Sequence, residues 1–183
     1  MVNIRKIFFI FLFLCISGSF VFGAVNIGGI DNFCKVEESF YRGAYPTEQG
    51  LQYLKQIGIK TIVDFRSPGR AVSQEKRLAE GLGIKYINIP FGFFRMPPED
   101  SQIRKFIDIV KDPANRPIFV HCQHGRDRTG MMVATYRIVV QDWPKEKAYQ
   151  EAKGYGFNPV YFHMKRFIFS RAEKFKVENE KKS

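Results

Sequence analysis

The segment 118–140 constrains the fold of this chain more than any other part of its sequence. It begins with the apolar run Ile118–Val120, which has the length and the β-branched content of a buried strand. A stretch of polar and small residues follows, and Met131–Val140 is then apolar for long enough to form a buried helix. A buried strand that leads through a polar loop into a buried helix is typical of α/β proteins.

Strand-like and helix-like segments alternate along the rest of the chain. Apolar runs predict three further strands: Phe40–Arg42, Ile59–Phe65 and Ile84–Ile89. Helical spacing of apolar residues predicts five further helices: Glu48–Ile57, Ala71–Gly81, Ser101–Lys111, Pro144–Lys153 and Pro159–Phe175. Segment 26–39 is expected to be an irregular lead-in and 92–100 a loop. The pattern predicts an α/β fold with a central, mostly parallel sheet flanked by helices, and a ligand site at the carboxyl ends of its strands.

Residues 1–23 have the composition of a secretory signal peptide. Two basic residues precede the apolar run Ile7–Ile16, and small residues follow it. We expect cleavage before Ala24 or after Ser19, with export to the periplasm or out of the cell. The alternatives are an uncleaved membrane anchor over residues 7–25, which is just long enough to span a bilayer, and a buried first helix.

The rest of the chain has the composition of one globular domain, with 45% hydrophobic and 26% charged residues. We assign residues 24–175 to this domain and 176–183 to a frayed, charged tail.

The formal net charge of +11 favours anionic partners such as phosphate esters, nucleic acid or an anionic membrane. The basic residues are scattered and form no known nucleic-acid-binding motif, so we expect no nucleic-acid partner and membrane contact only through an uncleaved leader. We expect Cys34 and Cys122 to be unpaired.

The loop after Ile118–Val120 has the chemistry of an anion site. Its sequence is His121-Cys122-Gln123-His124-Gly125-Arg126-Asp127-Arg128-Thr129-Gly130. A loop that wraps at a helix N-terminus points free N–H groups inward, and with the helix dipole these bind phosphate. Gly125 lets the backbone curl tightly, Gly130 allows close packing, and Arg128 can bind two phosphate oxygens. The same donors favour the thiolate of Cys122.

These groups predict a two-step displacement at phosphorus. The thiolate attacks to give a phosphocysteine, which water then hydrolyses, and neither a metal nor another cofactor is needed because the loop supplies the positive charge. His121 is expected to hydrogen-bond beneath the loop, and Thr129 to donate its hydroxyl to the thiolate; the alternatives are a plain core histidine and a helix-start residue. The other candidate substrate-binding residues are Gln123, His124, Gly125, Arg126 and Asp127.

The pattern His-Cys-x-x-Gly-x-x-Arg-Thr-Gly resembles the signature loop of the protein tyrosine phosphatase superfamily. Further stretches are similar to compact dual-specificity-type phosphatases, and in particular to secreted, periplasmic bacterial tyrosine phosphatases: Phe40–Pro46, Gly58–Arg66, Tyr136–Trp143 and Gly154–Phe157. The resemblance therefore covers most of the chain after the leader. It implies the cysteine-phosphatase fold, hydrolysis of phosphomonoesters and a phosphorylated protein as partner.

The chain departs from this family at the residue that protonates the leaving group. Members usually carry an aspartate about 30 residues before the cysteine, on a loop that here corresponds to Pro90–Met96 and holds no carboxylate. The remaining candidates for the general acid are Asp127, Asp100, and water or the substrate itself. Structural alternatives are that Asp127 is a partner of Arg126 or Arg42, and that Asp100 is the N-cap of the helix after it.

Aromatic and basic side chains elsewhere have two interpretations each. Three phenylalanines either form a wall of the substrate pocket or belong to the core: Phe91, Phe93 and Phe94. Two arginines either extend a basic rim around the loop or are ordinary surface residues: Arg66 and Arg70.

The leading functional hypothesis is a cysteine-dependent phosphomonoester hydrolase acting as a tyrosine or dual-specificity protein phosphatase. A phosphatase of inositol polyphosphates or phosphoinositides is the alternative, which His124, Arg126 and the positive charge favour. A non-catalytic phosphate-binding module and a sulfurtransferase are further alternatives. The intact residues Cys122, Arg128 and Thr129 argue against a binding module, and the Arg-Thr-Gly ending of the loop argues against a sulfurtransferase.

Overall fold

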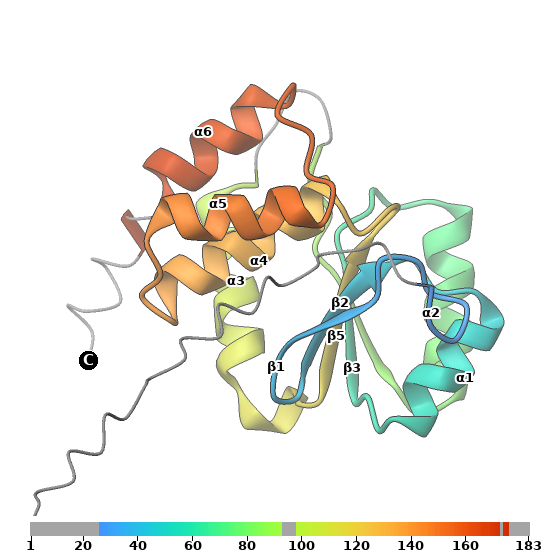
Figure 1. Ribbon diagram of the computed structural model, residues 1–183. Helices are drawn as coiled ribbons and strands as arrows, with labels where there is room; N and C mark the ends of the chain where they lie inside the picture. The colour runs from blue at the N-terminus through green and yellow to red at the C-terminus, as the bar shows by residue number, and fades with distance from the viewer. Residues whose placement is uncertain (1–25, 93–97, 173, 176–183) are drawn as a thin grey trace, which may run out of the picture.

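In the computed structural model, strands and helices alternate along the described residues, which are 26–92, 98–172 and 174–175 (Figure 1). The strands are β1 Cys34–Glu37, β2 Phe40–Ala44, β3 Thr61–Asp64, β4 Lys85–Asn88 and β5 Ile118–Cys122. The helices are α1 Glu48–Gln56, α2 Arg70–Gly81, α3 Asp100–Lys111, α4 Asp127–Val139, α5 Lys145–Gly154 and α6 Phe162–Ser170, with a short 3-10 turn at Pro113–Asn115. The predicted leader, Phe93, Phe94 and the tail 176–183 lie outside the described residues.

The five strands form one sheet in the order β1-β2-β5-β3-β4. Strand β5 is parallel to both of its neighbours, β2 and β3, and β3 is parallel to β4, whereas β1 is antiparallel to β2. The predicted mostly parallel sheet is therefore confirmed. Because β2, β5 and β3 run in the same direction, their carboxyl ends meet at one edge of the sheet, where the loop after β5 lies.

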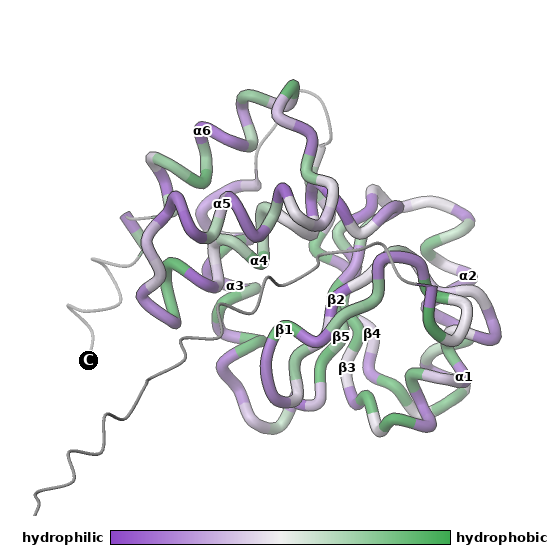
Figure 2. Tube along the Cα trace, in the orientation of Figure 1, coloured by the Kyte–Doolittle hydropathy of each residue, from purple (hydrophilic) through white to green (hydrophobic). Residues whose placement is uncertain are grey.

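Helices cover both faces of the sheet (Figure 1): α1 and α2 pack on one face, and α3, α4, α5 and α6 on the other. Both helix layers carry hydrophobic and hydrophilic residues (Figure 2), as helices with one buried face do, but α4 is buried on almost all sides. Side chains alternate between the two faces along β5. Val120 and Cys122 join the core beneath α3–α6, while Phe119 joins the core beneath α1 and α2, and His121 stacks on Phe119.

Strand β1 lies in the segment that the sequence predicts to be irregular. It is a short edge strand whose pairing with β2 shifts register between Lys35 and Glu37. Asn32 and Ser39, on either side of it, have positive φ angles of 55° and 61°. A bulged, four-residue edge strand produces no regular alternation of apolar residues, which is why the pattern did not predict it.

Helix α4 begins at Asp127, four residues before the predicted start at Met131. Asp127, Arg128, Thr129 and Gly130 therefore form its first turn. The Gly130 N–H donates to the carbonyl of the N-cap Arg126 at 2.7 Å, whereas the N–H groups before it have no carbonyl partner within the helix. Among the described residues, no helix is both long and apolar enough to cross a membrane.

Candidate active site

The loop between β5 and α4 crosses closely over the backbone of β2. Gly125 has a φ of 67°, and a Cβ atom added to it would lie 2.4 Å from the carbonyl carbon of Gly43. The predicted need for glycine at this position is confirmed. At Gly130 an added Cβ would meet side-chain atoms of Phe157, Ala152 and Arg42 at 3.4, 3.5 and 3.8 Å, which is ordinary contact. The predicted close packing at Gly130 is therefore wrong.

Two buried side chains hold the carbonyl of Gly125 from below. Arg42 Nη2 donates to this oxygen at 2.7 Å, and Asn32 Nδ2 donates to it at 3.1 Å. Asn32 Nδ2 also donates to the carbonyl of Tyr155 at 3.0 Å, while the guanidinium of Arg42 lies over the Tyr155 ring at 4.3 Å. One structural alternative for Asp127 is a bond to Arg42, but the Arg42 guanidinium donates to the loop backbone instead.

Cys122 is the last residue of β5 and is 3% exposed. Burial acts to raise the pKa of its thiol, but the Thr129 hydroxyl, the charge of Arg128 and the N–H groups of Thr129 and His124 prevail, and the pKa lies below its ordinary value. Thr129 Oγ1 is fully buried and has no hydrogen-bond partner of ordinary geometry. Its hydroxyl acts to lower the pKa of the Cys122 thiol, and the predicted hydrogen bond to the thiolate stays a prediction.

Arg128 connects the loop to the next strand of the sheet. Its Nη1 donates to the carbonyl of Phe65 at 3.2 Å, directly after the carboxyl end of β3. This bond draws the guanidinium to the edge where β3 and β5 end, and its charge acts on the sulfur of Cys122. Both effects agree with the predicted role of Arg128 as a phosphate ligand.

The two candidate general acids differ in their surroundings. Asp127 is 8% exposed and its Oδ1 accepts from the N–H of Asn158 at 2.8 Å; burial outweighs this bond and raises the pKa of the carboxyl group. Asp100 accepts hydrogen bonds from Lys174, at 3.1 Å, and Arg171, and these hold its pKa below the usual range. A carboxyl group that keeps its proton longer is the better donor, so the surroundings favour Asp127.

The structural alternative for Asp100 is also wrong. Glu99 is the N-cap of α3, and it forms a reciprocal capping box with Gln102. Asp100 is the first residue of the helix and points to the end of α6 instead. The N-cap thus lies one residue before the predicted position, and the Asp100 carboxylate pairs with Arg171 and Lys174 instead of capping the helix.

His121 lies beneath the loop in a buried cluster of charges. Its Nε2 is 2.9 Å from Glu75 Oε1 and its Nδ1 is 3.8 Å from Asp64 Oδ1, while Nδ1 also lies 3.2 Å from the carbonyl of Cys122. Burial acts to lower the pKa of the imidazole, but the two carboxylates prevail and raise it. The two carboxylates thus favour the protonated form of His121, so this residue is not a plain core histidine.

Arg66 completes this cluster. Its guanidinium donates to both carboxylates, Asp64 at 2.9 Å and Glu75, and the Tyr86 hydroxyl donates to Asp64 at 2.6 Å. Asp64, Glu75 and His121 are of the types that ligate metals, but here both carboxylates already accept hydrogen bonds from Arg66. Both interpretations of Arg66, a basic rim and an ordinary surface residue, are wrong, because its side chain is buried. Arg70 is exposed at the start of α2.

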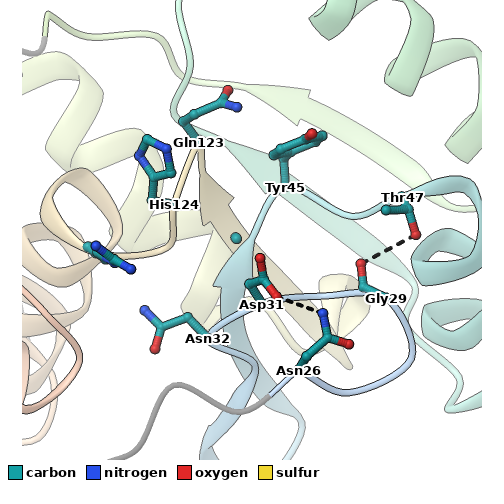
Figure 3. A pocket seen from close by; sticks show the side chains of 10 residues that line it. Asn26, Gly29, Asp31, Asn32, Tyr45, Thr47, Gln123 and His124 are labelled. Carbon is teal, nitrogen blue, oxygen red and sulfur yellow. Dashed lines mark hydrogen bonds between the residues drawn. The ribbon is translucent and has the colours of Figure 1, made fainter.

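A pocket of about 460 Å³ adjoins the loop (Figure 3). Three segments line it: Gln123, His124 and Arg126 of the loop, Ala44, Tyr45 and Thr47 after β2, and Asn26, Gly29, Asp31 and Asn32 of the lead-in. The sequence predicts the three loop residues, but not the other two walls.

The aromatic side chain at this pocket is Tyr45, which is 44% exposed. Phe91, one of the phenylalanines considered for such a wall, is buried against Phe65 with the ring centroids 5.7 Å apart. Phe91 therefore belongs to the core, and among the described residues Tyr45 is the aromatic residue of the three kinds Phe, Tyr and Trp that lines the pocket. The interpretation of Phe93 and Phe94 lies outside the described residues.

Comparison with known proteins agrees with this geometry. Residues 25–169 match the family described as DSP-PTPase phosphatase fused to NAD+ Kinase. The chain belongs to this family. It is 29% identical over 128 residues to the dual specificity protein phosphatase TpbA of Pseudomonas aeruginosa, covering 69% of this chain and 55% of TpbA. It is also 29% identical over 115 residues to the inositol diphosphatase DSP3 of Arabidopsis thaliana, covering 61% of this chain and 56% of DSP3.

The chain thus spans little more than half the length of these relatives. The crystal structure of a Cys-to-Ser variant of P. aeruginosa TpbA in complex with phosphotyrosine has the same fold, with a TM-score of 0.66 at 22% identity. That superposition covers 82% of this chain and 90% of the TpbA chain.

The residues that support the DSP-PTPase loop from behind were missed by the sequence analysis. Asp64 and Arg42 could have been singled out from the sequence, because each is a charged residue in a short, otherwise largely apolar strand and therefore needs a buried partner. Glu75 and Asn32 could not, because polar residues are common in amphipathic helices and in irregular segments. Only the folded structure shows that these two lie beneath the loop.

Proposed function

We propose that this chain is a cysteine-dependent protein phosphatase that hydrolyses phosphotyrosine, with phosphoserine and phosphothreonine as further substrates. The observation that carries the proposal is Cys122, a buried thiol of lowered pKa at the base of a loop that supplies N–H donors and the charge of Arg128. The thiolate is the nucleophilic form of cysteine, and it faces the donors that bind the oxygens of a phosphate group.

The residues divide the reaction between them as follows. Cys122 Sγ attacks phosphorus, the bond to the leaving oxygen breaks, and Asp127 gives its proton to that oxygen. Water then attacks the phosphocysteine and passes a proton to Asp127, which restores the carboxylic acid. The Thr129 hydroxyl stabilises the departing thiolate by a hydrogen bond. Arg128 and the N–H groups of the first turn of α4 bind the phosphoryl oxygens in both steps.

Hydrolysis of inositol phosphates is the second candidate function. Support comes from the likeness to DSP3, which is named an inositol diphosphatase, and from His124 and Arg126, which line the pocket beside the loop. Support for the leading candidate comes from the likeness to TpbA, which is named a dual specificity protein phosphatase, and from the Tyr45 ring, which offers a wall for an aromatic substrate.

The test is phosphate release by the full chain from a phosphotyrosine peptide and from inositol hexakisphosphate, with Cys122→Ser as the blank. We expect the peptide to have the higher kcat/KM. A higher value for inositol hexakisphosphate would move the function to polyanion metabolism. Release from neither substrate, or equal release by the variant, would overturn the proposal and favour a phosphate-binding module.

We also propose that residues 1–23 export the protein to the periplasm. Support comes from the composition of this segment, in which two basic residues precede an apolar run and small residues follow it. N-terminal sequencing of the protein from a bacterial periplasmic fraction is expected to begin at Ala24 or Phe20. An uncut chain in the membrane fraction would instead identify the segment as an anchor, and a cytoplasmic chain would contradict export.

A further inference from the structure

The pocket beside the loop is lined by ionisable side chains of both signs. Two basic side chains, His124 and Arg126, face one carboxylate, that of Asp31. The other polar side chains that line it are neutral: Asn26, Asn32, Gln123, Tyr45 and Thr47. A ligand with several phosphates would gain little from this balance of charges, whereas a ligand with one phosphate and nearby hydrogen-bond donors would match it.

Asp31 is held in place from two sides. The N–H of Ala44, at the end of β2, donates to the carbonyl of Asp31 at 2.8 Å, and Asn26 Nδ2 donates to Asp31 Oδ1 at 2.6 Å. The next residue, Asn32, is bonded to the Gly125 carbonyl of the loop. The position of Asp31 relative to the loop is therefore fixed by backbone and side-chain bonds.

The carboxylate of Asp31 is exposed to the pocket. In Figure 3 it extends from the lead-in wall on the side opposite Gln123 and His124. An ionised carboxylate accepts hydrogen bonds and donates none. It therefore attracts N–H and ammonium groups and repels further phosphate groups at the same place.

We propose that Asp31 is a specificity-determining residue that accepts a main-chain N–H or a basic side chain flanking the phosphorylated residue of a peptide. The same carboxylate selects against inositol polyphosphates, whose neighbouring phosphates would lie where the peptide presents its donors. This inference rests on the proposed phosphatase function, and it names the substrate class as phosphorylated peptides.

The experiment compares the full chain with Asp31→Asn and Asp31→Lys on a phosphotyrosine peptide and on inositol hexakisphosphate. Asp31→Asn keeps an oxygen that can accept from Asn26 and removes only the charge. We expect it to lower kcat/KM for the peptide about fivefold through KM, and to raise kcat/KM for inositol hexakisphosphate about threefold. Asp31→Lys is expected to change both values further in the same directions.

The matched control is Glu80→Gln, which removes the same charge from an exposed position near the end of α2. We expect its ratio of peptide to inositol hexakisphosphate kcat/KM to stay within twofold of the wild type. If both Asp31 variants also keep that ratio while the wild type releases phosphate from the peptide through Cys122, the role of Asp31 is overturned and the proposed function stands. A wild type without Cys122-dependent release from the peptide overturns the proposed function itself.

Discussion

Single residues of the loop differ in how much room the fold leaves them. An added methyl group at Gly125 would meet the Gly43 backbone at 2.4 Å, and a positive φ adds strain. We predict that Gly125→Ala lowers kcat/KM for a phosphotyrosine peptide at least 100-fold, because the loop must move to relieve this contact. The matched variant is Gly130→Ala in the first turn of α4, where contact is ordinary; we predict a change within about threefold. Equal effects of the two substitutions would contradict this account of the loop.

The two candidate general acids, Asp127 and Asp100, differ in the pKa of their carboxyl groups, which is raised for Asp127 and lowered for Asp100. We predict that Asp127→Asn lowers kcat for a phosphotyrosine peptide about 100-fold, since loss of a general acid typically costs 10²–10⁴-fold. The loss should be smaller for 4-nitrophenyl phosphate, whose leaving group is less basic. Because burial raises the pKa of Asp127, the wild-type rate should persist above the pH at which an exposed aspartate loses its proton. A larger loss in Asp100→Asn than in Asp127→Asn would reverse the assignment.

At the scale of elements, the cluster of His121, Asp64, Glu75 and Arg66 joins β5, β3 and α2 beneath the loop. Since the pKa of His121 is raised in the folded protein, its protonated form stabilises the fold. This contribution is fully present below about pH 6.5, the pKa of an unfolded histidine, and is lost as the pH rises through the folded-state value.

We therefore predict that the difference in unfolding free energy between the protein and its His121→Gln variant shrinks as the pH rises from about 6 to 9. Denaturant unfolding at a series of pH values measures it. Both proteins should carry Cys122→Ser, because the lowered thiol pKa contributes in the opposite sense, with stability lost as the pH falls through it. A difference that does not vary with pH would show that His121 is neutral in the folded protein.

The elements that follow from periodicity were predicted from the sequence, and those set by tertiary contacts were not. Segments 48–57, 71–81 and 101–111 appear as α1, α2 and α3 within a residue or two, because each buries one apolar stripe. Strand β1 exists because β2 pairs with it, and α4 starts early because the polar residues 127–130 close a helical turn on the loop. Neither the strand pairing nor the early helical turn produces a periodic pattern of apolar residues in the sequence.

At the scale of the whole molecule, distant segments converge on the Gly125 carbonyl. Asn32 joins the lead-in to the loop, 93 positions along the chain, and to Tyr155, 123 positions along. We predict that Asn32→Ala lowers kcat more than it raises KM and reduces the melting temperature, because the carbonyls of Gly125 and Tyr155 lose a donor. The control is Gln52→Ala, on the exposed face of α1. A melting temperature and kcat unchanged in Asn32→Ala would show that Arg42 alone holds the loop.

The account as a whole depends on covalent catalysis by Cys122, and acid-quenched reactions of the full chain with a phosphotyrosine peptide test it most directly. Mass spectrometry of the digested protein should find one phosphoryl group on the peptide that contains Cys122, formed within the first turnover and absent in Cys122→Ser. Phosphate release without a phosphoryl group on Cys122, or turnover by Cys122→Ser at the wild-type rate, would contradict the account.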